Sequence, residues 1–302
     1  MKALIISGGG AKGAFGGGIA DYLIRGKQED YDIFVGTSAG SLLVPLLAAG
    51  EVQKLKDLFS TVTQKDVFKR NPFIIKKTGK IFSTRINHIN TIKMFLKKNK
   101  TFGDSSNLRD FIERNFSKQT FKKLKGGKKE VIVTVCNFTE YSTEYKSIHD
   151  CSYDDFCDWM WISANFVPFM SLVIKDGHEY ADGGFGDYLP IHPAIDLGAK
   201  KIDAIFLRPE KININNMRAT DPFGVLLRGF EFMLYKIGFD DIVISQLAAN
   251  QNNVTIDVYH APRVLTDNAF VFDPETMSAW WNEAYEYAKN TPPRRISEAV
   301  DV

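Results

Sequence analysis

Ser38 lies between two glycines in the sequence Gly-Thr-Ser-Ala-Gly, with Gly36 two positions before it and Gly40 two positions after it. The apolar run Ile33–Val35 precedes this sequence, and an apolar stretch with a helical pattern follows it. A strand, a tight turn that carries a serine, and a helix form a nucleophile elbow, which requires very small residues at these two flanking positions. The pattern therefore predicts a serine nucleophile at the first turn of a helix, where free N–H groups stabilise negative charge.

A glycine-rich loop, Gly8-Gly9-Gly10-Ala11-Lys12-Gly13, follows the apolar run at residues 2–7. Successive N–H groups in such a loop can form a nest that binds an anion. An ester carbonyl under attack by a serine develops negative charge on its oxygen, and backbone N–H groups are the usual donors to it. We therefore expect Gly8, Gly9 and Gly10, with Ala39 directly after the serine, to form an oxyanion hole.

Two other interpretations of the glycine loop remain open. The spacing of Gly8, Gly10 and Gly13 satisfies the fingerprint of dinucleotide-binding proteins, which also needs an acidic residue at the end of the second strand. Here the second strand ends in the serine elbow, and Asp30 and Asp32 lie at its beginning, so this alternative is less favoured. The glycines could also serve only close packing of a helix on a strand. A P-loop is excluded because no Gly-Lys-Ser/Thr follows.

A serine nucleophile needs a general base, and the sequence offers two types of candidate. The five histidines are His88, His149, His178, His192 and His260. His260 follows a predicted strand late in the chain, as the histidine of a Ser-His-Asp hydrolase does. The other candidate is Asp182, which follows a predicted hairpin and precedes Gly183 and Gly184. Burial raises the pKa of a carboxyl group, so a desolvated aspartate can act as a base. Each candidate also has a non-catalytic interpretation. His260 could be a surface residue at the end of a strand, and Asp182 could belong to an ordinary Asp-Gly turn.

The three motifs together resemble the patatin-like phospholipase family. That family combines an early glycine loop containing Arg or Lys, a Gly-x-Ser-x-Gly elbow and a distant Asp-Gly-Gly/Ala, and this chain has all three in that order. The resemblance implies a Ser38–Asp182 dyad without histidine, metal or cofactor, acting on lipid esters. It also implies that Lys12 orients the glycine loop or contacts a phosphate. Bulky residues at 163–168 depart from the family pattern.

The order of predicted elements favours an α/β fold, a three-layer sandwich with a mainly parallel central sheet. Strands are predicted at 2–7, 31–35, 130–138, 144–148, 202–207 and 254–259, and helices at 14–25, 41–63, 154–164, 224–250 and 275–289. The Asp176-Gly177 pair predicts a hairpin turn. We expect one catalytic domain at 1–290 and a loose tail at 291–302.

Positive charge is concentrated between Lys65 and Lys129, where 19 Lys and Arg residues accompany 4 Asp and Glu residues. We expect this region to be a helical cap or insertion, in which 91–98 is basic and amphipathic as in membrane-surface helices. Such a region is either a solvated insertion or a face that binds anions. Given the family resemblance, the expected partners are a phospholipid substrate and an anionic membrane, and no nucleic acid.

The composition is that of an ordinary globular protein, with 44% hydrophobic and 25% charged residues. Three cysteines at spacings atypical of metal sites fit a reducing compartment. The apolar run at the N-terminus is too short for a signal-peptide core, and no apolar run in the sequence approaches the length of a membrane span. These features predict a cytoplasmic protein, with peripheral contact at a membrane.

Overall fold

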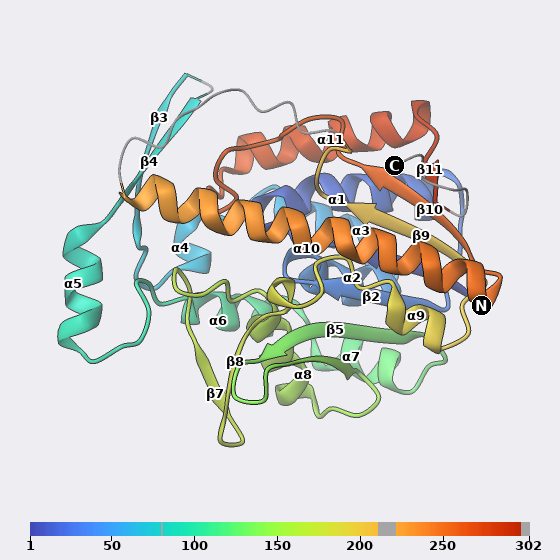
Figure 1. The fold of residues 1–302 in the computed structure, drawn as a ribbon, viewed down its shortest axis with the longest axis horizontal. Helices are drawn as coiled ribbons and strands as arrows, with labels where there is room; N and C mark the ends of the chain where they lie inside the picture. The colour runs from blue at the N-terminus through green and yellow to red at the C-terminus, as the bar shows by residue number, and fades with distance from the viewer. Residues whose placement is uncertain (80, 211–221, 297–302) are drawn as a thin grey trace.

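A nine-stranded sheet forms the centre of the protein in the computed structural model, which describes residues 1–79, 81–210 and 222–296 (Figure 1). The strand order is β11-β10-β9-β1-β2-β5-β8-β7, with β6 also paired to β5. The strands are β1 (Lys2–Ile6), β2 (Ile33–Thr37), β5 (Glu130–Asn137), β6 (Ser142–Ser147), β7 (Val173–Lys175), β8 (His178–Asp182), β9 (Lys201–Phe206), β10 (Thr255–His260) and β11 (Arg294–Arg295).

Five neighbouring strands, β10, β9, β1, β2 and β5, run parallel to one another. Their side chains are almost continuously buried, as expected for parallel strands covered on both faces. In register, Ile6 lies beside both Gly36 and Ile205, so the carboxyl ends of β1, β2 and β9 meet at one edge. Ligand sites in open α/β sheets lie at this edge.

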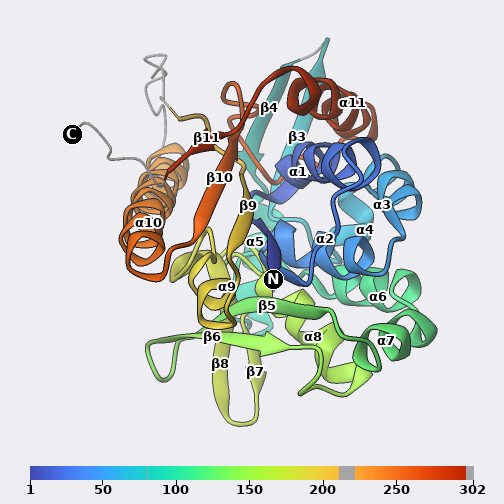
Figure 2. The same cartoon turned by 90° about the vertical axis from the view of Figure 1, so that its right-hand side faces the viewer.

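Helices cover both faces of the sheet, and the fold is therefore the expected three-layer α/β sandwich (Figure 2). One layer contains α1 (Gly13–Asp21), α2 (Ala39–Ala48), α3 (Val52–Phe59), α8 (Tyr153–Ser163) and α11 (Pro274–Asn290). The other contains α9 (His192–Asp196) and α10 (Pro222–Asn252). Although α10 has 31 residues, no helix in the described ranges is long and apolar enough to cross a bilayer.

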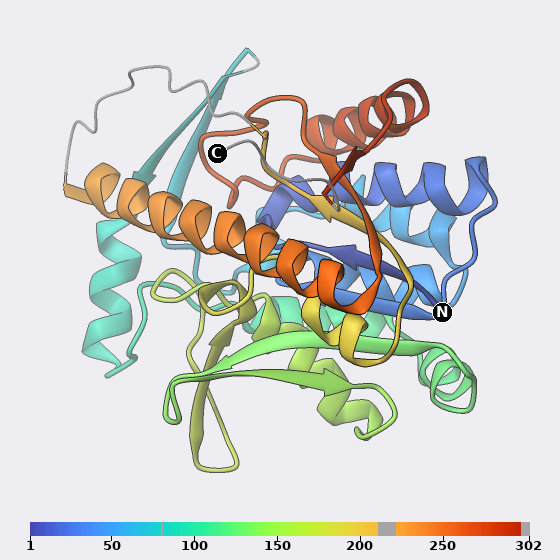
Figure 3. The ribbon, with the colours of Figure 1, turned by 45° about the vertical axis from the view of Figure 1, so that its right-hand side comes forward.

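The basic region is only partly helical, which corrects the expectation of a helical cap. It contains α4 (Gln64–Val67), α5 (His88–Leu96), α6 (Ser106–Asn115) and α7 (Lys118–Lys125). Between α4 and α5, β3 (Phe73–Thr78) and β4 (Ile81–Ile86) form a separate antiparallel hairpin (Figure 3). The hairpin forms because Phe73 is buried against aromatic rings from distant segments, stacking on Phe270 at 5.2 Å between ring centroids.

Two further expectations need correction. The helix expected at 41–63 is interrupted after α2 by Gly50, whose φ of 78° is a left-handed conformation that ends a helix. The expected loose tail is ordered at its start, because β11 pairs with β10 and Arg295 forms an ion pair with Asp257 at 3.0 Å. Residues 297–302 of the expected tail lie outside the described residues. The Asp176-Gly177 turn is confirmed, with positive φ at both residues.

Candidate active site

Ser38 occupies a sharp turn between β2 and α2. Its backbone has φ 53° and ψ −118°, a conformation that L-residues rarely adopt and that holds the side chain of a nucleophile above the sheet edge. The flanking glycines are sterically required. A Cβ at Gly36 would lie 2.4 Å from the Gly40 carbonyl, and a Cβ at Gly40 would lie 2.1 Å from the Ile6 carbonyl oxygen. The sequence pattern therefore forms the expected elbow.

Asp182 ends β8, which pairs with β5 next to the strand that carries the serine. Its carboxylate accepts a hydrogen bond from the Gly184 N–H at 2.8 Å and lies close enough to the Ser38 hydroxyl for a hydrogen bond. The side chain is only 2% exposed. Two residues 144 positions apart in the sequence are thus brought together at the same edge of the sheet.

Burial raises the pKa of Asp182 to about 7, although the hydrogen bonds from Ser38 and Gly184 act in the opposite direction. A carboxyl group that exchanges its proton near neutral pH can accept a proton from a nucleophile and return it to a leaving group. Because the carboxylate is buried, water molecules compete little with Ser38 for hydrogen bonds to it. This environment gives an aspartate the protonation behaviour that a catalytic histidine ordinarily has.

Residues in the segment 163–168, which the sequence analysis noted only for its bulk, and Thr37 hold these two residues in place. The Ser38 N–H donates to the Ser163 hydroxyl at 3.0 Å, and the Asp182 N–H donates to the Asn165 carbonyl at 3.0 Å. Ser163 and Asn165 lie at the end of α8, so one segment supports both candidates. The Thr37 hydroxyl donates to the Asp187 carbonyl at 2.9 Å, joining the elbow to the loop after Asp182.

The glycine loop passes directly beside the elbow. A Cβ at Gly13 would lie 3.0 Å from the Ala39 side chain, and one at Gly8 would lie 3.3 Å from the Ser38 side chain. The Gly8 N–H, however, already donates to the Tyr188 carbonyl at 3.1 Å. Gly9 and Gly10 line the same cavity as Ser38, as does Ala39 at the start of α2. Of the four expected oxyanion donors, these three are therefore the better placed.

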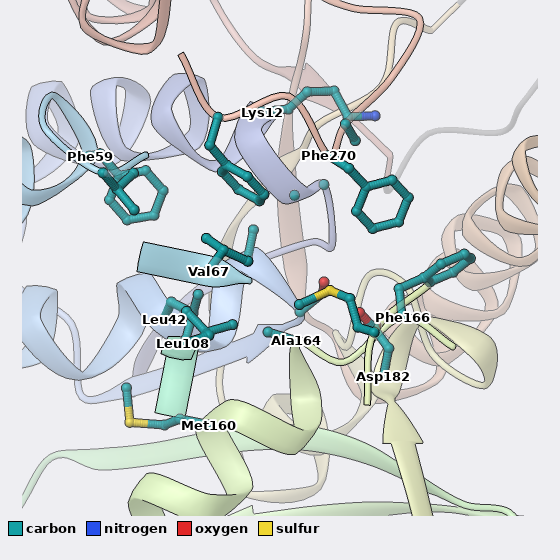
Figure 4. A pocket seen from close by; sticks show the side chains of 18 of the residues that line it. Lys12, Leu42, Phe59, Val67, Leu108, Met160, Ala164, Phe166, Asp182 and Phe270 are labelled. Carbon is teal, nitrogen blue, oxygen red and sulfur yellow. The ribbon is translucent and has the colours of Figure 1, made fainter. Parts of the chain in front are cut away.

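A long apolar cavity extends from Ser38 and Asp182 into the helical layer (Figure 4). Asp182, Lys12 and Phe270 lie toward one side of the view, whereas the side chains on the opposite side are apolar. Those apolar lining residues include Leu42, Phe59, Leu108 and Met160. Helices α2, α3, α6 and α8 contribute them, so part of the basic region helps to enclose the cavity.

None of the five histidines, all of which lie within the described ranges, lines this cavity. His260 ends β10, and both β9 and β1 separate it from the strand that leads to Ser38. At about 4.8 Å per strand, the separation is on the order of 14 Å. Its ring packs edge-on against Phe206, and burial lowers its pKa. The geometry thus favours Asp182 over His260 as the partner of the serine.

An α/β sandwich with a serine elbow and a buried aspartate beside an apolar cavity is an arrangement suited to ester chemistry on apolar substrates. A family model described as "Patatin-like phospholipase" matches residues 4–195, which is more than half of the chain. The chain therefore belongs to the patatin-like phospholipase family. Membership supports lipid acyl hydrolase activity in general.

Among solved structures, the chain is similar to the crystal structure of VipD from Legionella pneumophila, with a TM-score of 0.47 and 14% sequence identity. The match covers 95% of this chain and 66% of that chain. A comparison with curated protein sequences finds no match.

Proposed function

We propose that the protein is a phospholipase A or lysophospholipase in which Ser38 is the nucleophile and Asp182 the general base. The Ser38 oxygen attacks the carbonyl carbon of a carboxylic ester while Asp182 accepts the serine proton. The carbonyl oxygen becomes negatively charged and accepts hydrogen bonds from the N–H groups of Gly9, Gly10 and Ala39. When the tetrahedral intermediate collapses, the bond to the alcohol breaks and Asp182 returns the proton to the leaving alcohol.

The resulting acyl-enzyme is hydrolysed by the same two residues. Water attacks the acyl carbonyl, Asp182 accepts a proton from the water, and the released Ser38 oxygen receives that proton as the fatty acid leaves. Asp182 thus alternates between base and acid, which suits a pKa of about 7. The observation that carries the proposal is that Ser38 and Asp182 lie within hydrogen-bond reach of each other and both line the apolar cavity.

The apolar cavity supplies the binding energy for one fatty-acyl chain. Burial of each methylene group contributes about 0.8 kcal/mol, so a cavity lined by leucine and phenylalanine side chains favours esters of long fatty acids over esters of short acids. The cavity leads away from the catalytic pair between α2, α3, α6 and α8. We expect long-chain lysophospholipids to have a higher kcat/KM than acetyl esters.

Fluorophosphonate labelling tests the proposal. A fluorophosphonate should label the wild-type protein on Ser38, and the Ser38→Ala variant should be neither labelled nor able to hydrolyse a panel of phospholipids and lysophospholipids. Ser142→Ala, at an exposed position on β6, is the matched control and should behave as the wild type. Retained hydrolysis in folded Ser38→Ala protein would contradict the proposal.

A basic and apolar face on α5 supports contact with an anionic membrane. Four large apolar side chains of this helix are exposed: Ile89 (67%), Ile92 (56%), Phe95 (52%) and Leu96 (79%). Exposed lysines lie beside them at 93, 97 and 98. This combination is typical of helices that insert into a lipid surface. The helix lies at the end of the molecule to which the parallel strands point, the same end as the sheet edge with Ser38 (Figure 1).

Replacing Phe95 and Leu96 by Asp should weaken binding to vesicles at least ten-fold, because both apolar insertion and the attraction to anionic lipid are lost. Co-sedimentation with phosphatidylcholine vesicles containing phosphatidylglycerol measures the effect. Leu197→Asp is the control, since Leu197 is exposed directly after α9, at the opposite end of the molecule from α5 (Figure 1). Equal binding of the α5 variant and the control would exclude α5 as the membrane contact.

A further inference from the structure

Arg208 is a buried cation that the proposed chemistry does not use. It follows β9 at the carboxyl edge of the sheet and is only 6% exposed, yet it lines the same cavity as Ser38 and Asp182. One guanidinium nitrogen, Nη2, lies 3.0 Å from a carboxylate oxygen of Glu231, whereas Nε has no hydrogen-bond partner among the described residues. A buried guanidinium with an unused donor is costly unless a ligand completes its hydrogen bonds.

A second cation lines the cavity with Arg208, and one carboxylate pairs with Arg208 directly. Lys12, 7% exposed, lines the cavity with Arg208, and Glu231 is the carboxylate that faces them. Burial alone would raise the pKa of Glu231, but Lys12 and Arg208 lower it overall, so Glu231 is charged at neutral pH. The Glu231 side chain is 47% exposed, so the carboxylate that pairs with Arg208 also borders solvent.

Tyr188 fixes the position of Arg208 relative to the nucleophile. The Arg208 guanidinium lies over the Tyr188 ring, 5.1 Å from its centroid. The edge of the same ring lies 2.9 Å from where a Cβ of Gly8 would be, and that point is 3.3 Å from the Ser38 Cβ. The Tyr188 ring therefore contacts Arg208 on its face and approaches the glycine loop beside Ser38 with its edge. In a glycerophospholipid, the phosphate and the scissile ester are attached to one glycerol unit, so a group that binds the phosphate must line the same cavity as the nucleophile, as Arg208 does.

We propose that Arg208 forms a subsite for the phosphate group of the substrate, beside the Lys12 that the family resemblance already connects with a phosphate, and that Glu231 pairs with Arg208 until the phosphate displaces it. A planar guanidinium held on an aromatic ring presents two parallel N–H donors, which match two phosphate oxygens. Lys12 adds a second positive charge from the glycine loop. The subsite rests on the proposed function, since it selects among lipid esters according to whether they carry a phosphate.

The test compares two substrates with the same acyl chain, a lysophosphatidylcholine and a monoacylglycerol. In Arg208→Gln the ratio of kcat/KM for the phosphate-bearing ester over the neutral ester should fall at least ten-fold, and Arg208→Lys should restore part of it. Glu231→Gln should raise the ratio, because the competing carboxylate is removed. Arg263→Gln is the matched control: Arg263 pairs with Glu283 at 2.8 Å on the surface and does not line the cavity.

A binding measurement separates this proposal from the proposed activity. Ser38→Ala protein should bind lysophosphatidylcholine more tightly than monoacylglycerol, and Arg208→Gln in that background should remove the difference, whether or not the wild type hydrolyses either lipid. Competition by inorganic phosphate would show that the subsite takes a free phosphate as well as a headgroup, and no competition would restrict it to the lipid. Equal losses for both lipids in Arg208→Gln, with a lowered melting temperature, would assign Arg208 a structural role only and overturn the proposal.

Discussion

Replacing Asp182 by Asn is expected to lower kcat for ester hydrolysis by about 10³-fold while the protein remains folded. The amide oxygen of Asn can still accept the hydrogen bond that the Gly184 N–H gives to Asp182, so the loop geometry should persist. An amide cannot accept a proton from Ser38, and the serine would remain a neutral hydroxyl. Steady-state kinetics on a lysophospholipid measure the loss, and circular dichroism and thermal unfolding establish that the fold is intact.

Two further variants make the comparison specific. Asp176→Asn carries the same chemical change in the exposed turn of the hairpin that ends at Asp182, and Asn tolerates its positive φ. Its activity should match that of the wild type. His260→Ala tests the histidine alternative and should retain activity within about two-fold, because His260 does not line the cavity. Wild-type activity in Asp182→Asn, or inactivity in folded His260→Ala, would contradict the Ser38–Asp182 pair.

The second large effect is a dependence on pH. Burial raises the pKa of Asp182 to about 7, and only the deprotonated carboxylate can accept the serine proton. Below this pKa, kcat/KM should fall about ten-fold for each pH unit, so at pH 5 it should be about 100-fold below its plateau. A neutral monoacylglycerol is the substrate to use, because no phosphate on it titrates.

The rate of fluorophosphonate labelling gives an independent measure of the same protonation. Labelling depends on activation of the Ser38 hydroxyl, so it should follow the same curve as kcat/KM and lose its dependence on pH in Asp182→Asn. A labelling rate in the wild type that stays constant from pH 5 to pH 8 would contradict the role of Asp182 as the base.

The central fold and the serine elbow were predictable because local sequence determines them strongly. The strands at the sheet centre are short apolar runs buried on both faces, and their predicted positions agree with β1, β2, β5, β9 and β10 within about two residues. The elbow was recognisable because only glycine fits at positions 36 and 40. Choosing Asp182 as the candidate base needed the order of three motifs, since an isolated Asp-Gly-Gly is compatible with an ordinary turn.

Other features depend on contacts between distant segments and have little local signal. The β3–β4 hairpin carries exposed lysines and a weak alternation of apolar residues, and its anchor, Phe73, packs against Phe270 nearly 200 positions later. Arg208 and Glu231 likewise meet only because α10 crosses the sheet edge where β9 ends. In the sequence they are two ordinary charged residues, and nothing near either one indicates that Arg208 is buried.

The central claim is that Ser38, activated by Asp182, carries the acyl group during hydrolysis. Trapping the intermediate tests it most directly: the protein is mixed with a lysophospholipid, quenched in acid within milliseconds, digested and analysed by mass spectrometry. We predict that the peptide containing Ser38 gains the mass of the fatty acid minus the mass of one water molecule. The adduct should be absent from Ser38→Ala. Hydrolysis with no acyl adduct on Ser38, or with the adduct on another residue, would contradict the account.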